Sequence, residues 1–529
     1  MKKFTFFISL LLFVGIAFKS NAAAPTVTVA IGEDAPALEA YAALEMARQF
    51  KELFQASVEV AKFAPPNTEH LVLVGSPATN PAIAKLVGDK WPKKLSEQGH
   101  LLKSIEIDGK TVLIVGGGSP VATLWAVYEL GHSFGIRYML HDDFLPVDTP
   151  EFTLAGFDTV LEPNLRIRAW QVAFAGPASQ ESWGLAEQKI LLKQLAKLKF
   201  NRVSLAQKAS QQENANGKEF SVSGDTAGRS VFAGAKIFEN PDLAGKNTVQ
   251  ERIDARIKML AEVSNLARKL GIRPSAIAKK QVDSKIVLLP LGQGGGGLLP
   301  QFSTSKLPAK LAEIRSGKKD GFAVTCSIPG DLNMDIYYLS RASFDSKITP
   351  AESLVDLVKP ICGEGVVERL SNGFAAIEEV SALIEKNDYD FAVPDPKMFM
   401  KNYTSSEPAP EWWAKATELY GTAVNEMYRG NTRARDGARP FILYQAKHFT
   451  FALHYMMAVD AARKAGIARA AKDTDAQVEN LETAVEQMHN ALGIYADVAR
   501  DNSDRGVIAI LNKYAYRPLL KELDELPLP

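Results

Sequence analysis

Three aspartates lie in places where a carboxyl group could do acid–base chemistry. Asp331 follows the strand pattern GFAVTCS and precedes a helix, and Asp335 lies one helical turn later. Asp225 lies in the long loop after the strand pattern NRVSLA. Carboxyl groups at the carboxyl ends of barrel strands can act as general acid and base. We therefore identify Asp331 and Asp225 as candidate catalytic residues.

Each aspartate also has a structural interpretation. An aspartate before a helix, such as Asp331, can cap the first backbone N–H groups. Asp335 fits a first-turn acid that the helix dipole favours. Asp225 lies in SVSGDTAGRS, where a Gly-Asp pair is typical of a turn. The sequence leaves both interpretations open for all three residues.

Two arginines and a tryptophan alternate along the strand pattern LRIRAWQVAF. Because side chains repeat every second residue in a strand, Arg166, Arg168 and Trp170 share one face. A guanidinium could hold a carboxylate in a bidentate pair, and the indole could stack on a sugar; equally, the arginines could form structural ion pairs and the tryptophan could pack. We predict Arg166, Arg168, Trp170 and Asp335 as substrate-binding residues.

Two glycine-rich stretches suggest nucleotide binding but do not fit it. In TVLIVGGGSPVATLWAVYELG (111–131), a G-x-G-x-x-G pattern that begins at Gly116 would need its third glycine at Val121. The run GQGGGG (292–297) is not followed by the Lys and Ser/Thr of a phosphate loop. We predict a structural turn at the first, a mobile loop at the second, and no cofactor.

Metal chemistry is also disfavoured. All 7 histidines lie outside residues 142–447, so the predicted catalytic region has no imidazole for zinc or for a Ser-His-Asp triad. In a later predicted helix, Tyr444, His448, Phe451 and Tyr455 line one face, a spacing typical of core packing. No metal site is predicted.

The patterns that must position these residues divide the chain into three parts. Residues 25–150 alternate short apolar strands with amphipathic helices, including a DGK hairpin turn, which predicts a small α/β domain. Residues 158–348 repeat strand, helix, strand, as a TIM-type β/α barrel does. Residues 349–529 show only helical periodicity. The predicted fold class is therefore an α/β multidomain protein with a possibly incomplete barrel and an all-α C-terminal domain.

Composition and the first residues bound the protein's setting. The 61 basic and 61 acidic residues give no basic footprint for nucleic acid. A basic start, an apolar core and small residues predict a cleaved secretory signal at residues 1–23, and hence export to the periplasm or beyond. The sequence contains no later run of about 18 apolar residues, so no membrane span is predicted. Cys326 and Cys362 are too few for a disulfide scaffold, and whether they pair is left open, as is the oligomeric state.

Three stretches resemble one family. YAALEMARQFKELF and GGGSPVATLWAVYELGHSFGIRYML are similar to the domain that precedes the barrel in bacterial α-glucuronidases and hexosaminidases. WGLAEQKILLKQLAKLKFNRV resembles the opening of their catalytic barrel, and a helical domain follows the barrel in α-glucuronidases. The resemblance implies an exported glycoside hydrolase acting on uronic-acid-containing polysaccharide fragments, with an oligosaccharide substrate.

The sequence departs from this family in the barrel. Residues 166–345 allow five or six strands, whereas a complete barrel usually takes about 250 residues. The gap falls near residues 277–285, where the family's acid-bearing middle strands would lie. Glycoside hydrolysis normally needs two carboxyl groups across the sugar. Two hypotheses remain: an α-glucuronidase-like hydrolase, or a non-catalytic carbohydrate-binding or degenerate relative.

Overall fold

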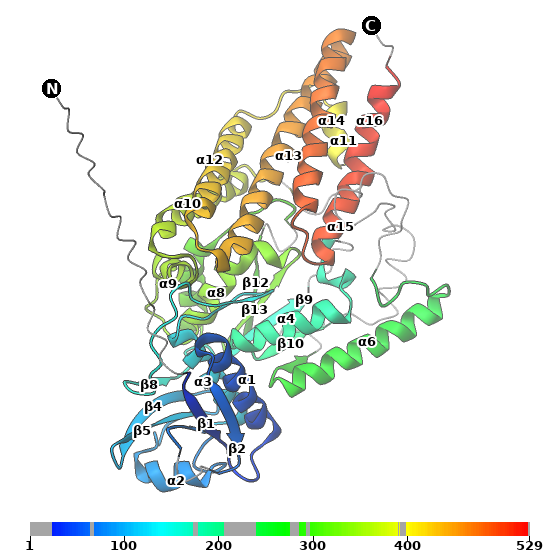
Figure 1. Cartoon of the computed structure of the whole chain (residues 1–529). Helices are drawn as coiled ribbons and strands as arrows, with labels where there is room; N and C mark the ends of the chain where they lie inside the picture. Colours follow the sequence, from blue (N-terminus) through cyan, green and yellow to red (C-terminus); the bar gives the residue numbers. More distant parts are fainter. Residues whose placement is uncertain are drawn as a thin grey trace, which may run out of the picture.

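The chain is arranged as a six-stranded sheet, a five-stranded parallel sheet and a bundle of long helices, stacked one after another (Figure 1). The predicted signal at 1–23, Asp225 and most of the GQGGGG run lie outside the described residues. The computed structural model describes residues 24–63, 68–172, 178–205, 240–275, 285–292, 297–389, 391 and 398–526.

The N-terminal sheet has strand order β2-β1-β3-β5-β4-β8 and is covered on both faces. Alternate residues of β5 enter two different cores: Leu113 and Val115 pack on the α1/α3 side, Val112 and Ile114 on the α2 side. This confirms the predicted α/β architecture. Its elements are β1 (Thr26–Ala30), α1 (Ala37–Phe54), β2 (Ser57–Ala61), β3 (His70–Val74), α2 (Pro81–Val87), β4 (His100–Ile107), β5 (Lys110–Gly117), α3 (Pro120–Ser133) and β8 (Asp158–Leu161).

The predicted hairpin turn is confirmed. β4 and β5 pair antiparallel up to Ile107 and Lys110. Asp108 and Gly109 between them both have positive φ, 50° and 75°. Two successive positive φ values match a type I′ turn, which follows the natural twist of paired strands.

The glycine-rich turn after β5 packs against the protein's own backbone. A Cβ on Gly116 would lie 2.2 Å from the Gly75 carbonyl oxygen, and one on Gly118 would lie 1.9 Å from that of Ser96. Ser119 then caps α3 by accepting a hydrogen bond from the Ala122 N–H. The glycines therefore allow a close strand-to-helix approach, as predicted for a structural turn.

The central sheet is wholly parallel, with order β11-β10-β9-β13-β12. Its strands alternate with helices, as a β/α repeat requires, but β11 and β12 lie at opposite edges, so the described strands form an open sheet and no closed barrel. The elements are β9 (Ile167–Val172), α4 (Leu185–Lys197), β10 (Arg202–Ser204), α6 (Val249–Lys269), β11 (Arg273–Ser275), β12 (Ile286–Pro290), α7 (Leu307–Ser316), β13 (Gly321–Cys326) and α8 (Asn333–Ala342).

The described residues from Pro350 onward form helices and contain no strand. The longest helix, α13, has 33 residues and packs along α12 and α14 (Figure 1). No described helix is both long and apolar enough to cross a membrane. The helices are α9 (Pro350–Cys362), α10 (Glu364–Lys386), α11 (Met398–Thr404), α12 (Trp412–Arg433), α13 (Arg439–Ala471), α14 (Thr474–Ala496), α15 (Asn502–Leu511) and α16 (Arg517–Asp524).

The two cysteines do not pair. Cys326 at the end of β13 and Cys362 at the end of α9 are both free and buried. Burial raises the pKa of the Cys362 thiol to about 12 and that of Cys326 still further. Both thiols therefore stay protonated and behave as small apolar side chains.

A buried ion cluster joins the N-terminal sheet to the central one. The Glu129 carboxylate of α3 accepts hydrogen bonds from Lys199 Nζ at 2.5 Å and from Arg341 Nη1 at 2.8 Å. Burial alone would raise the pKa of Glu129, but Arg341 and Lys199 hold it well below its usual range. The three side chains come from α3, from the turn before β10 and from α8, so this ion cluster fixes how the two layers meet.

The packing of the glycine turn predicts a loss of stability in Gly118→Val. The added side chain has no room beside the Ser96 carbonyl, and overpacking of this kind costs about 1–3 kcal/mol. The melting temperature should fall. Gly421→Ala in α12 is the matched control, because nothing lies within 4 Å of the added Cβ and alanine is the better helix former. Calorimetric NAD or FAD binding by the parent, lost in Gly118→Val, would contradict the structural interpretation.

Candidate functional site

A group of buried polar side chains lies where the helical bundle meets the carboxyl edge of the central sheet. β13 ends at Cys326 on this edge, and the turn Pro329–Leu332 follows it. The first half of α13 contacts this turn through Gln445, and α15 contacts α13 through Asp504. The group consists of Asp331, Tyr444, His448, Tyr495 and Asp504.

Asp331 contacts a histidine rather than capping a helix. Its Oδ1 lies 2.6 Å from His448 Nδ1, and the two residues are only 5% and 1% exposed. The N-cap position of α8 is Leu332, which makes no side-chain cap. The capping interpretation of Asp331 is therefore wrong: its carboxylate enters the interface with α13.

The close approach of α13 to the Asp331 turn depends on a glycine. A Cβ on Gly330 would lie 2.2 Å from Tyr444 Oη. The Gly330 carbonyl accepts hydrogen bonds from Gln445 Nε2 at 3.2 Å and from Asn333 Nδ2 at 2.9 Å. These contacts hold the turn in place and fix the position of Asp331.

His448 lies between two tyrosines and a second carboxylate. Its ring centroid is 4.0 Å from that of Tyr444 and 4.2 Å from that of Tyr495. Both tyrosine hydroxyls donate to Asp504 Oδ1, at 3.1 and 3.0 Å. His448 Nε2 lies 4.0 Å from the same oxygen. The imidazole thus faces one carboxylate on each side, and its Nε2 makes no hydrogen bond among the described residues.

Burial tunes the second carboxylate. Burial, followed by the neighbouring charge of Asp501, raises the pKa of Asp504 to about 6. Asp501 itself caps α15 through the N–H groups of Ser503 and Asp504, and its Oδ2 lies 2.8 Å from His141 Nε2. Burial thus favours the protonated form of Asp504, which is 0% exposed.

Glu187 ties α4 to the start of α15 at the same edge. It accepts hydrogen bonds from the backbone N–H groups of Gly184, at 2.9 Å, and Asn502, at 2.9 Å. The pKa of Glu187 is raised to about 7. Burial is the main cause and the charge of Asp501 adds to it, while the hydrogen bonds from the backbone N–H groups act in the opposite direction. Four carboxyl groups in different environments thus lie at this edge: Asp331, Asp501, Asp504 and Glu187.

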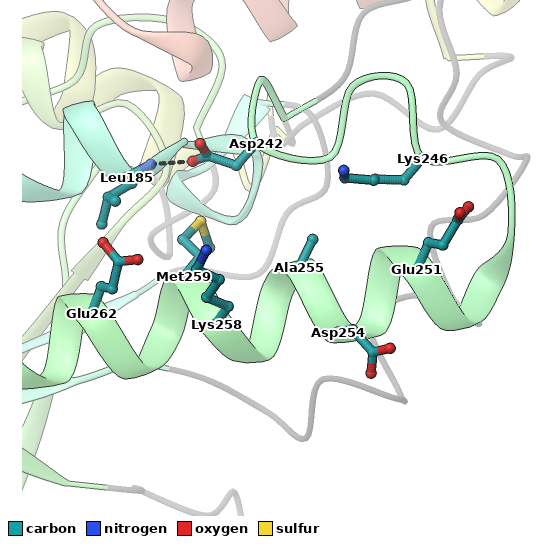
Figure 2. Close-up of a pocket in the computed structure, with 9 residues that line it drawn as sticks. All are labelled: Leu185, Asp242, Lys246, Glu251, Asp254, Ala255, Lys258, Met259 and Glu262. Carbon is teal, nitrogen blue, oxygen red and sulfur yellow. Dashed lines mark hydrogen bonds between the residues drawn. The ribbon is translucent and has the colours of Figure 1, made fainter.

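An open groove lies beside this edge, along α6 (Figure 2). It has a volume of about 470 Å³ and begins at Leu185, the first residue of α4. Asp242 accepts a hydrogen bond from the Leu185 N–H, and Glu251 accepts two from the backbone before α6. These two acids therefore stabilise helix ends. Figure 2 shows Lys246 and Lys258 on the same groove.

Asp335 is in the first turn of α8, as predicted, but fully buried. Thr304 Oγ1 donates to its Oδ1 at 2.5 Å, and its Oδ2 has no hydrogen-bond partner among the described residues. Burial raises the pKa of Asp335 to about 7. The position does not give a substrate direct access to its carboxyl group.

Arg168 lies at the other end of β9. It is fully buried; its guanidinium donates to the carbonyls of Lys199, at 2.6 Å, and Leu165, at 2.7 Å, and it stacks on Trp125 and Phe344. Burial lowers its pKa to about 9. Arg168 is therefore part of the contact between the first two layers and makes no described ion pair.

Trp170 and Arg166 are also placed away from Asp331. Trp170 is fully buried and packs edge-on against Phe200. Arg166 is exposed and precedes β9 at its amino end. The structure thus brings Asp331 together with His448 and Asp504, but not with Arg166, Arg168 or Trp170.

Sequence analysis missed the imidazole of the site. The face of α13 that bears Tyr444, His448, Phe451 and Tyr455 is buried, as predicted for core packing. Two of its members nevertheless contact carboxylates: His448 contacts Asp331 across the layer boundary, and Tyr444 bonds to Asp504 within the bundle. A histidine and a tyrosine one turn apart on a buried face were the available signal. Metal binding finds no support in the described part of the chain, where no three His, Cys, Asp or Glu side chains form a suitable group.

The buried carboxyl of Asp335 predicts a pH dependence of stability. Its pKa of about 7 exceeds the ordinary 3.8, so the folded state keeps a proton that the unfolded chain releases. The contribution is fully present below about pH 4 and is lost at about 1.4 kcal/mol per pH unit as the pH rises toward 7. Asp335→Asn keeps an acceptor for Thr304 but cannot ionise.

The measurement is the urea midpoint of the parent and of Asp335→Asn at about pH 5 and about pH 8. The variant should lose less stability between the two. Equal losses in both proteins would contradict a raised pKa at this residue.

Comparison with known proteins agrees with this architecture. Residues 17–130 match the family described as Glycosyl hydrolase family 67 N-terminus. No protein of curated function matches the sequence.

Solved structures extend the likeness to the fold of the whole chain. A family GH115 4-O-methyl-α-glucuronidase with specificity for decorated arabinogalactans is 10% identical, with 89% of this chain and 78% of that chain covered and a TM-score of 0.52. A family 89 glycoside hydrolase from Clostridium perfringens is 12% identical, with coverages of 93% and 76% and a TM-score of 0.47. Residues 17–130 thus match the N-terminal segment of glycosyl hydrolase family 67, and the fold of the chain resembles that of an α-glucuronidase-like glycoside hydrolase.

Proposed function

We propose that the protein is an exported, non-hydrolysing relative of α-glucuronidases that binds uronic-acid-containing polysaccharide fragments. In this proposal residues 1–23 are a cleaved signal, and residues 25–150, 158–348 and 349–529 are three domains. The middle domain is a barrel that has lost its central units.

The strand order supports a reduced barrel. In a closed eight-stranded barrel the last strand pairs with the first. Here β13 pairs with β9, and β12 and β11 continue the sheet on either side. The five strands therefore correspond to barrel positions three, two, one, eight and seven, and positions four to six have no counterpart among the described strands.

The connection between β11 and β12 carries the proposal. Only residues 276–285 link Ser275 to Ile286. At about 3.5 Å per residue this length spans at most roughly 35 Å, enough to cross the sheet, whereas one strand–helix–strand unit takes about 30 residues. We infer from this length that the acid-bearing middle strands implied by the family resemblance are missing, and with them one carboxyl of the pair that hydrolysis needs.

The groove along α6 supports binding at the same edge. It opens where α4 begins, next to the end of β9 where barrel proteins bind their ligands. Lys246 and Lys258 are exposed on it and offer positive charge to a uronate carboxylate. Asp254 and Glu262 supply acceptors for sugar hydroxyls.

Hydrolysis is the second candidate, because Asp331, His448 and Asp504 lie together at this edge. Asp504 is fully buried, and Glu187 is held by two backbone N–H groups. With Asp331 as the acid, the second carboxyl would therefore come from outside the described residues, where Asp225 lies. The two candidates differ in what Asp331→Asn does, since loss of an acid–base group typically costs about 10²–10⁴-fold in rate.

We expect uronic-acid-capped oligosaccharides to bind without being cleaved. Calorimetry measures binding, and release of reducing ends measures hydrolysis. Lys246→Ala combined with Lys258→Ala should weaken binding at least tenfold, because the ligand carboxylate loses its cations. Lys269→Ala, at the far end of the same helix, is the matched control and should bind as the parent does.

Asp331→Asn completes the test. In the binding protein it lowers the melting temperature, because it disturbs the buried contact between Asp331 and His448, but leaves affinity within about threefold. Cleavage by the parent that falls a hundredfold or more in Asp331→Asn would overturn the proposal in favour of a hydrolase.

A further inference from the structure

A second groove lies at the opposite, amino edge of the central sheet, between this sheet and the start of α3. It has a volume of about 290 Å³, and three arginines line it: Arg166 before β9, Arg202 on β10 and Arg273 on β11. Arg166 and Arg273 are exposed, and Arg202 is half-buried. The groove is therefore open to a ligand from solvent.

Two of these arginines are held side by side by the sheet itself. Arg202 and Arg273 are register partners on neighbouring parallel strands, about 4.8 Å apart across the sheet and on the same face. Like charges directly opposite each other in a sheet are destabilising. A bound anion would relieve this repulsion.

The neutral polar groups of the groove are already occupied. Asn201 donates to Gln98 Oε1 and to the Arg166 carbonyl, and its Oδ1 accepts from the Arg168 N–H. Ser119 donates to the Glu97 carbonyl and caps α3. By contrast, no described side chain forms an ion pair or hydrogen bond with the guanidinium of Arg166, Arg202 or Arg273. The hydrogen-bond donors that the groove leaves without a described partner are therefore these three guanidinium groups.

The acids on the groove do not neutralise these cations. Glu97 and Asp320 line it, but neither lies within ion-pair distance of the three arginines in the part of the chain that the structure describes. The amino end of α3 also reaches the groove at Ser119 and Val121, and its dipole favours negative charge. The local field therefore attracts an anion.

The floor of the groove is shaped by a close approach. Gly271 has φ +74°, and a Cβ there would lie 2.3 Å from Val121 Cγ2. The turn that precedes β11 is thereby brought against the start of α3, so the position of Arg273 is fixed by the fold and not by a free loop.

We infer that this groove is an oxyanion site, which takes a carboxylate or sulfate group, either borne by an acidic polysaccharide or free in solution. Paired guanidinium groups match the two oxygens of such a group in bidentate geometry. The site is separate from the groove along α6, so it does not depend on the function proposed above.

The test uses trigalacturonate and inorganic sulfate as probes on the whole chain. Arg202→Gln and Arg273→Gln keep most of the side-chain length but remove the charge. Each should weaken binding of at least one probe about fivefold or more, while Arg268→Gln, an exposed arginine at the end of α6, should not. If trigalacturonate binds far more tightly than sulfate, the ligand of the site is an acidic polysaccharide. If the two probes bind with equal affinity, the ligand is a free anion.

Two further readings separate this site from the rest of the protein. Without a probe, Arg273→Gln should melt no lower than the parent, because a like-charge contact is removed. Lys246→Ala with Lys258→Ala should leave sulfate binding unchanged. Failure of both probes to bind, or equal binding by the parent and both arginine variants, would overturn the inference.

Discussion

The buried Glu129 carboxylate is the contact on which the arrangement of the layers depends. It is surrounded by Lys199 and Arg341, which come from two separate elements of the central layer. A buried charge is tolerated only when it is paired, and removal of one partner of such a pair typically costs about 3–5 kcal/mol. Because the pairing is satisfied in one relative position only, α8 has a fixed place against α3. The turn that carries Asp331 comes directly before α8.

The helical bundle is tied to this frame by a second polar contact. Asp356 of α9 accepts hydrogen bonds from Arg137, at 2.8 Å, and from Tyr337 of α8, at 2.6 Å. In the buried polar group at the carboxyl edge, Asp331 thus belongs to the central layer, and His448 and Asp504 belong to the bundle. The relative positions of these side chains therefore depend on how the central layer and the bundle pack together.

Local patterns in the sequence predicted local structure well. The Asp108–Gly109 hairpin and the glycine turn at Gly118 follow from backbone sterics within a few residues. Alternation placed Arg168 on a strand, but it does not tell which end of the strand faces the ligand, and Arg168 lies at the amino end. The partner of Asp331 is His448, in another layer and far along the chain, and its pairing depends on tertiary contacts that no spacing encodes. The depth of burial of Trp170 and Asp335 is likewise a property of the assembled layers.

The pairing of β9 with β13 has a consequence for how the chain folds. β9 begins at Ile167 and its neighbour β13 at Gly321, so the middle of the central sheet forms only by closing a very long loop. Non-local pairings of this kind make folding slow. The N-terminal sheet joins mostly strands that are close in sequence and can form while synthesis continues. β9 cannot pair with β13 until Cys326 has been synthesised. The contacts among Asp331, His448 and Asp504 form only after α15 has been synthesised.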